Sequence, residues 1–377
     1  MAGIYIHIPF CKQACHYCDF HFSTSLKKKD ELLKAIHTEL VLRKSELPQP
    51  VETIYFGGGT PSLLSKTELQ TILSVVYEHY VVTPDPEITL EANPDDLSEA
   101  TLKELSETAI NRLSIGVQSF FEEDLKLMNR AHNASEALKS IELAKRYLNN
   151  CSIDLIYGIP GMSLQRWEEN LQTALSLEVP HLSCYALTVE PKTALEAFIK
   201  KGVVAPVDDA VAQAHYETLV ESTEAAGYEN YEFSNFGLKG FHSRNNTAYW
   251  HGKPYLGIGP SAHSYNGDTR SWNVSNNAKY IQKVFEGDLP LEREQLSTRD
   301  KYNEYVMTRL RTQQGASLAE IETLFGLKYR EYVLQQAKEY MDEGLLLLSP
   351  PFLKVSRKGK FLSDGIASGL FLVNLDS

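Results

Sequence analysis

Short apolar runs alternate with amphipathic segments through the first 235 residues, and this alternation restricts the fold more than any other feature. The apolar runs, each bounded by turn residues, predict strands over Ile4–Ile8, Thr53–Phe56, Glu87–Glu91, Arg112–Val117, Ser152–Tyr157 and His181–Leu187. The intervening segments predict helices over 29–47, 66–80, 99–107, 134–148, 164–177 and 210–226. Such alternation produces parallel strands with right-handed crossovers, in either a doubly wound sheet or an incomplete barrel.

Polar or glycine-rich clusters follow four of the predicted strands: Gly57–Pro61, Glu91–Pro94, Gln118–Phe120 and Asp154–Gly161. The carboxyl ends of parallel strands meet at one edge of the sheet, where ligands bind, so the clusters predict a common site. Glu91, Gln118, Arg130 and Asp154 are each also typical of a surface or structural role. Together they suit a zwitterion that carries ribose hydroxyls.

The glycine run at 57–59 allows two interpretations, a tight turn or a close approach of the backbone to a ligand. It lacks the lysine of a phosphate-binding loop and the spacing of a dinucleotide fingerprint. Binding of nucleotide phosphates is therefore not expected here.

Three cysteines, Cys11, Cys15 and Cys18, lie within eight residues of one another. Iron–sulfur clusters take cysteine ligands, and three ligands on a four-iron cluster leave one iron open, as in reactive rather than structural metal sites. Zinc is the alternative, with His16 or His21 as a fourth ligand, although structural zinc sites usually draw on a second, distant pair. Cys151 and Cys184 lie apart, in apolar segments that predict small buried side chains.

Charge and hydropathy exclude several classes of protein. The chain has 377 residues and a net charge of −12, which argues against a broad nucleic-acid or anionic-membrane surface. No apolar run approaches the ~18 residues that an integral membrane segment needs, and the first residues lack the basic region of a secretory signal. Clustered thiols indicate a reducing compartment, so a cytoplasmic location is expected.

Beyond the predicted barrel (1–235), a transition segment (236–295) is rich in Tyr, Asn, Gly and His. Its histidines, His242, His251 and His263, and its aromatic residues suit either a flat apolar ligand or, as the favoured interpretation, a packing seam. The last part (296–377) predicts three helices and a hairpin over 345–355, which is typical of a winged helix. Its basic residues are interspersed with acids, which favours contacts within the chain or with a protein over DNA binding.

The run Tyr5–Phe20, with its Cys-x3-Cys-x2-Cys spacing, and the later Gly57–Leu64 resemble the radical S-adenosylmethionine (SAM) superfamily. The resemblance extends over nearly the whole chain to the coproporphyrinogen III oxidase-like branch, through Glu87–Pro94, Asn111–Phe120, Arg130-x-His132, Asp154–Gly161, Tyr231–Phe236 and Tyr255–Tyr265. It implies an α/β fold, namely an incomplete (β/α)6 barrel followed by a helical, winged-helix-like domain.

The same resemblance implies a [4Fe–4S] cluster on Cys11, Cys15 and Cys18, whose open iron binds the amino and carboxylate groups of SAM. The positions at which relatives contact SAM are Tyr5, Tyr17, Gly58, Gly59, Thr60, Glu91, Gln118, Arg130 and Asp154. No residue is assigned a catalytic role.

Two features distinguish between branches of the family. Coproporphyrinogen dehydrogenases resemble this chain but carry an N-terminal extension and a further Cys two residues after the third, where this chain has Phe20. Both differences indicate the heme-chaperone branch. That branch has the signature His-Asn-x-x-Tyr-Trp, which here runs from Asn245 to Trp250 without the histidine. An amide is a poor iron ligand, so His242 and His251 become the flanking candidates.

The function expected from this resemblance is a radical SAM-type heme chaperone that passes heme to an acceptor protein. An electron donor such as a flavodoxin or ferredoxin would be needed for reductive cleavage of SAM. The alternative is an oxygen-independent coproporphyrinogen III dehydrogenase, which oxidatively decarboxylates its substrate in heme biosynthesis.

Overall fold

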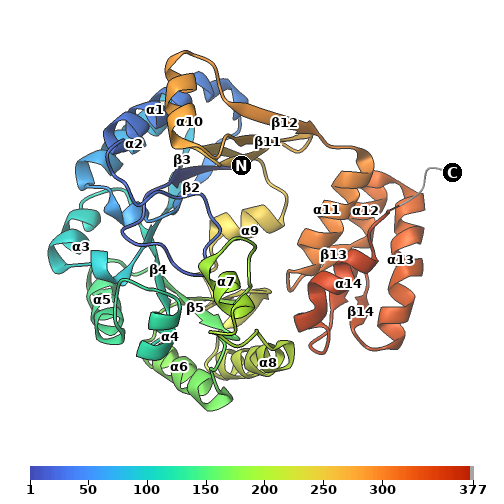
Figure 1. Cartoon of the computed structure of the whole chain (residues 1–377). Coiled ribbons are helices and arrows are strands. Elements are labelled where there is room, and N and C mark those ends of the chain that lie inside the picture. The colour runs from blue at the N-terminus through green and yellow to red at the C-terminus, as the bar shows by residue number, and fades with distance from the viewer. Residues whose placement is uncertain (374–377) are drawn as a thin grey trace.

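The computed structural model describes residues 1–373, and its largest element is a curved sheet of twelve strands with helices around the outside (Figure 1). The strand order is β12-β11-β10-β9-β1-β2-β3-β4-β5-β6-β8-β7. Its centre consists of β1 (Ala2–Ile8), β2 (Val51–Gly58), β3 (Val82–Ala92), β4 (Arg112–Gln118), β5 (Cys151–Tyr157) and β6 (His181–Ala186), all parallel. These are the six predicted strands, so the incomplete (β/α)6 barrel is confirmed.

The predicted helices are also present, with small shifts at their ends. They are α1 (Lys29–Leu42), α2 (Lys66–His79), α3 (Glu99–Ser106), α5 (Ala134–Tyr147), α6 (Leu164–Ser176) and α8 (Asp209–Ala225). The first ends earlier than predicted and continues as a 3-10 turn at Lys44–Glu46. Further 3-10 turns occupy Pro61–Leu63, Pro94–Asp96 and Lys360–Leu362. The short helices α4 (Glu122–Leu127) and α7 (Ala194–Lys200) follow β4 and β6, and sequence periodicity did not reveal them.

The segment expected as a transition extends the sheet. From it, β9 (Tyr255–Ile258) pairs in parallel with β1, and β10 (His263–Tyr265), β11 (Thr269–Asn273) and β12 (Leu291–Gln295) continue antiparallel, with α10 (Asn277–Phe285) beside α1. At the other edge lie β8 (Asn235–Gly237) and β7 (Glu229–Glu232). These strands are short, and β12 is a largely exposed, polar edge strand, so their sequences lack the apolar runs that predict strands.

Alternation along the central strands separates an apolar outer face from a polar lumen. In β1, Ile4, Ile6 and Ile8 are fully buried in the core shared with the helices. Tyr5 and His7 point to the opposite face, where the Tyr5 ring stacks on Tyr55 of β2 at 6.1 Å. The polar residues predicted for the site therefore belong to the inner face of the barrel.

Helix α9 (Arg244–Trp250) packs against β1 and β2 at the base of the barrel, the end at which the central strands begin. The backbone N–H groups of Arg244 and Asn245 donate to the Glu87 carboxylate of β3, at 3.0 and 2.9 Å. A buried acid thus satisfies the free donors at the start of the helix.

The C-terminal domain has a hydrophobic core of its own and the predicted winged-helix-like form. Its elements are α11 (Thr298–Leu310), β13 (Ala316–Ser317), α12 (Leu318–Phe325), α13 (Leu327–Asp342), β14 (Leu346–Ser349), β15 (Phe352–Val355) and α14 (Ser363–Gly369). The predicted hairpin is β14 and β15, and β13 adds a third strand. Among the described helices, none combines the length and apolarity required to cross a bilayer.

Candidate functional site

The three clustered cysteines lie in an irregular loop that follows β1 at the rim of the barrel. All three are free and half-buried. Burial raises the pKa of the Cys11 thiol, and that of Cys18 to about 11, so their thiolate forms require a nearby positive centre. In the residues that the structure describes, no three His, Cys, Asp or Glu side chains converge on a single metal ion. The ligands of a four-iron cluster bind different irons and do not meet at one point.

Arg130 joins the cysteine loop to the ends of two strands. Its Nη1 donates to the Cys15 sulfur at 3.3 Å, and its Nη2 donates to the Asn93 side-chain oxygen at 2.7 Å and the Gly116 carbonyl at 2.8 Å. The buried Nε has no partner. Gln118 adopts a φ of 68°, in the left-handed region, and a Cβ on Gly116 would lie only 2.9 Å from its amide nitrogen.

Two carboxylates, from β3 and β5, face the lumen below the place where Arg130 joins the cysteine loop to the strand ends. Glu91 accepts hydrogen bonds from the Tyr55 hydroxyl (2.8 Å) and the Gly58 N–H (3.1 Å), and Asp154 accepts one from the Ser114 hydroxyl (3.2 Å). Burial raises the pKa of Glu91 to about 7, with a further contribution from the charge of Asp154. Burial likewise raises the pKa of Asp154 to about 6. Such a pair favours a bound cation or hydroxyl donors.

The glycine run is explained largely by packing within the protein. A Cβ on Gly58 (φ +109°) would lie 2.6 Å from the His7 ring, and one on Gly59 would lie 2.6 Å from the Phe10 carbonyl. The N–H groups of Gly58, Gly59 and Thr60 all donate inside the protein, to Glu91, Ile8 and Phe10 respectively. Any ligand contact of this segment would therefore use other atoms.

The remaining predicted SAM contacts are two tyrosines, one in the cysteine loop and one on β1. Tyr17 is half-buried beside Arg130, and burial raises its pKa. Burial also raises the pKa of Tyr5, with Glu91 adding to the effect. The nine residues predicted as SAM contacts thus lie on strands β1 to β5 and in the loops that follow β1, β2 and α4.

Sequence reasoning missed three residues near the site, Tyr55, Ser114 and Lys12, whereas Asn93 lies in the predicted cluster Glu91–Pro94. Tyr55 and Ser114 alternate with the apolar residues of their strands, so the period of two could have identified them. Lys12 forms ion pairs with Asp95, at 2.8 Å, and Asp96 in the loop after β3. No local signal in the sequence predicts that pairing.

The signature segment lies at the opposite end of the barrel from the cysteine loop. Asn245 is 6% exposed, and its side-chain oxygen accepts a hydrogen bond from the Thr53 hydroxyl at 3.3 Å. Thr53 precedes Gly58 by five residues on β2, which is about 16 Å along a strand. Asn245 and the cysteine loop therefore belong to different sites.

The three histidines of this region lie on different elements and have different partners. His242 stacks on Tyr231 at 4.2 Å, with its Nε2 3.2 Å from the Glu229 carboxylate. His251 follows α9, and its Nδ1 lies 2.8 Å from the Thr247 carbonyl. His263 stacks on Trp272 in β11. His16 and His21 are the fourth ligands considered for zinc. A ring nitrogen of His16 is hydrogen-bonded to the Leu127 carbonyl, and one of His21 to the Asn277 side chain.

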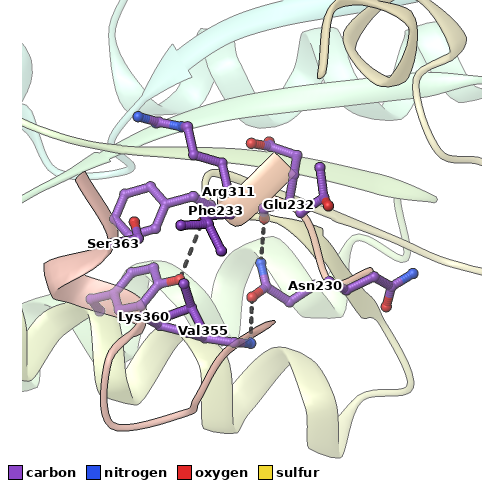
Figure 2. A pocket seen from close by; sticks show the side chains of 11 residues that line it. Asn230, Glu232, Phe233, Arg311, Val355, Lys360 and Ser363 are labelled. Carbon is purple, nitrogen blue, oxygen red and sulfur yellow. Dashed lines mark hydrogen bonds between the residues drawn. The ribbon is translucent and has the colours of Figure 1, made fainter. Parts of the chain in front are cut away.

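A small pocket of about 40 Å³ lies at the seam between the barrel and the C-terminal domain (Figure 2). There Lys360 donates to the Asn230 side-chain oxygen at 2.6 Å. The guanidinium of Arg311 lies over the rings of Phe233 and Trp250, at 5.3 and 5.1 Å. Trp250 thus contributes to a packing seam, the interpretation favoured from the sequence.

Many basic side chains of the winged-helix-like domain pair within the chain. Arg309 donates to the Trp250 and His251 carbonyls, and Arg357 pairs with Glu221 and Glu224 of α8. Arg330 pairs with Glu322 inside the domain. These contacts agree with the expected use of the module within the chain.

Arg311→Ala is expected to destabilise the protein by about 2 kcal/mol, because two cation–π contacts in a partly desolvated seam are lost. Its ion pair with the mostly exposed Asp364 contributes little. The measurement is the midpoint of urea unfolding, together with the rate of proteolytic cleavage between the two cores. The matched control is Arg330→Ala, whose exposed ion pair should change stability by less than about 0.5 kcal/mol. Equal losses of stability in the two variants would contradict a stabilising role of the Arg311 cation–π contacts.

With this geometry established, comparison with known proteins gives consistent results. Residues 5–174 match the family model described as the radical SAM superfamily, and residues 296–362 match the HemN C-terminal domain. The chain is 35% identical to the heme chaperone HemW of Bacillus subtilis, over 100% of both chains. It is 33% identical to HemW of Escherichia coli, over 98% of both. The solved structure of the coproporphyrinogen III oxidase HemN from Escherichia coli superposes with a TM-score of 0.86 over 99% of this chain and 90% of that one, at 24% identity, and shows the fold alone.

The barrel, the three-cysteine loop at its rim and these matches define a radical SAM protein. Within that superfamily, the chain belongs to the HemW family.

Membership of the superfamily implies SAM and a [4Fe–4S] cluster. The residues present fit both groups. Three free thiols lie in one loop at the rim, and the half-buried Arg130 beside them has a buried Nε with no hydrogen-bond partner. Two lumen carboxylates with raised pKa values complete a set of donors and acceptors suited to a zwitterion.

Proposed function

We propose that this protein is a radical SAM-type heme chaperone, which holds a [4Fe–4S] cluster and SAM in its barrel and delivers heme to an acceptor protein. The observation that carries the proposal is the junction at the barrel rim, where Arg130 contacts Cys15 beside the paired acids Glu91 and Asp154. The full-length similarity to relatives named heme chaperone supports heme as the molecule that this protein carries. The clustered thiols support a cytoplasmic location.

In this proposal, Cys11, Cys15 and Cys18 hold the cluster. SAM contacts Tyr5, Tyr17, Gly58, Gly59, Thr60, Glu91, Gln118, Arg130 and Asp154. The barrel occupies residues 1–235, with the segment 236–295 and the C-terminal domain 296–377 following it. When reduced, the cluster supplies an electron for cleavage of SAM, for which a flavodoxin or ferredoxin is the proposed donor.

The charged residues of the site suit different groups of SAM. Arg130, the half-buried cation at the rim, suits the SAM carboxylate. Glu91 and Asp154, deeper in the lumen, suit an ammonium group or ribose hydroxyls. The barrel walls exclude water from the bound ligand, which strengthens each of these contacts.

SAM affinity is expected to rise about tenfold between roughly pH 6 and pH 8. The pKa of Glu91 is raised to about 7, so the acid is mostly protonated at the lower pH and mostly ionised at the higher one, and only the ionised form attracts a cation. Equilibrium dialysis with labelled SAM across this range measures the effect. In Glu91→Gln the affinity should be lower and nearly independent of pH over the same range. A slope retained in that variant would contradict the role of Glu91.

For heme, the structure favours His251 as a ligand over the other residues near the signature. Its Nδ1 faces the Thr247 carbonyl, which leaves Nε2 free as an acceptor, the usual arrangement of a metal-ligating histidine. Asn245 is buried at the barrel base, and His242 stacks on Tyr231.

Anaerobic heme titration followed at the Soret band should therefore show about tenfold weaker binding in His251→Ala, a cost of about 1.4 kcal/mol. Binding by His242→Ala should match the unmodified protein, and Asn245→His provides the comparison in which the family histidine is restored. Unchanged affinity in His251→Ala would remove that residue from the heme site. Turnover of coproporphyrinogen III with SAM and reductant, without heme binding, would replace the chaperone proposal by the dehydrogenase.

A further inference from the structure

Four consecutive residues, from the last residue of α4 onward, contact four consecutive residues of the cysteine loop. Residues 127–130, here termed the clamp segment, lie against residues 13–16, which have no regular secondary structure of their own. Cys15 and His16 are half-buried, so their backbone polar groups must find partners outside helices and strands, while Gln13 and Ala14 are exposed. The clamp segment supplies several hydrogen-bond partners to this loop.

His16 makes two of these contacts. Its backbone N–H donates to the Met128 carbonyl at 3.1 Å, and its ring Nδ1 donates to the Leu127 carbonyl at 2.8 Å. Both carbonyls belong to the end of α4, where they have no partner within the helix. The loop therefore completes the helix end, and the helix end fixes the direction of the loop between Cys15 and Cys18.

Asn129 makes two hydrogen bonds with the cysteine loop, one to Ala14 and one from Gln13. The Asn129 side-chain amide donates to the Ala14 carbonyl at 2.7 Å, and the Gln13 side-chain amide donates to the Asn129 carbonyl at 2.9 Å. Asn129 has a φ of 56°, in the left-handed conformation that commonly ends helices. Glycine is the usual residue at such a position, but it could not make the contact to Ala14.

Arg130, next in the chain, contacts the Cys15 sulfur itself. The backbone that orients Asn129 toward the loop thus also places a cation against a cysteine. Side chains that orient the ligands of a metal site commonly change its metal affinity by about 10- to 100-fold.

We propose that the clamp segment holds the cysteine loop in its cluster-binding conformation before any cluster is present, with Asn129 as its principal positioning residue. This inference rests on the proposed function, since it assumes that the three cysteines carry the cluster. It adds that the end of α4 shares in setting the geometry of the loop, together with the Lys12 ion pairs to Asp95 and Asp96 and the hydrogen bond from the Leu195 N–H to the His16 carbonyl at 2.8 Å.

The test uses Asn129→Gly, which keeps the left-handed backbone and removes only the side chain. In the full-length protein without cluster, hydrogen exchange of residues 13–16 should be about tenfold faster in this variant than in the unmodified protein. After anaerobic reconstitution, the variant should release iron to a ferrous chelator about tenfold faster, and the EPR line shape of its reduced cluster should change.

The matched control is Glu178→Gly, which alters another non-glycine residue with a positive φ (50°), in the turn between α6 and β6. It should leave the exchange of residues 13–16 and the rate of iron release unchanged. Unchanged exchange and unchanged iron release in Asn129→Gly would overturn the inference. A failure of the unmodified protein to take up iron would instead refute the proposed function, while the exchange measurement still decides whether the clamp holds the loop.

Discussion

Cys15→Ala is expected to abolish the iron–sulfur cluster, reducing iron after anaerobic reconstitution from about four atoms per chain to nearly none. Cys15 is the central cysteine of the loop and the one whose sulfur accepts a hydrogen bond from Arg130. A cluster left with two protein ligands exposes two irons to solvent and is lost. Iron and sulfide analysis, with the visible absorption of the cluster, measures the result.

The matched control for that substitution is Cys184→Ala. Cys184 is fully buried in β6, and burial raises its pKa, as expected for a small core side chain without metal-binding function. This variant should keep its iron and lose only a little stability. Iron retained by Cys15→Ala, or stoichiometric zinc in the unmodified protein, would refute the assignment of the cluster.

Arg130→Met is expected to produce the second large effect, on both stability and SAM binding. The substitution removes the hydrogen bonds that Arg130 donates to the Asn93 side-chain oxygen and the Gly116 carbonyl, which costs about 3 kcal/mol in unfolding free energy. It also removes the cation proposed to bind the SAM carboxylate, so affinity should fall by about one to two orders of magnitude.

Urea unfolding and equilibrium dialysis with SAM measure the two effects separately. Arg130→Lys keeps the charge but cannot reach three acceptors at once with the fixed geometry of a guanidinium, so it should recover only part of each loss. If the Arg130→Met variant binds SAM with normal affinity, Arg130 does not bind the SAM carboxylate. This conclusion holds whatever the stability of the variant.

Much of the barrel could be predicted because its strands and helices carry strong periodic signals. The six central strands are apolar runs such as Ile4–Ile8, and the α2 helix begins at the capping box of Ser65 and Glu68. The strands β7–β12 could not be predicted, since short or exposed edge strands such as β12 are stabilised by pairing with neighbours distant in sequence.

The sequence by itself determined the chemistry available to this protein: three thiols in one loop, acids and an arginine near strand ends, and an asparagine in place of the signature histidine. Those properties follow from residue identity and local spacing. Only the tertiary structure decided which groups meet, because such contacts join residues far apart in the chain. It placed Arg130 on Cys15 and the clamp segment against the cysteine loop, and it separated Asn245 from that loop by the length of the barrel.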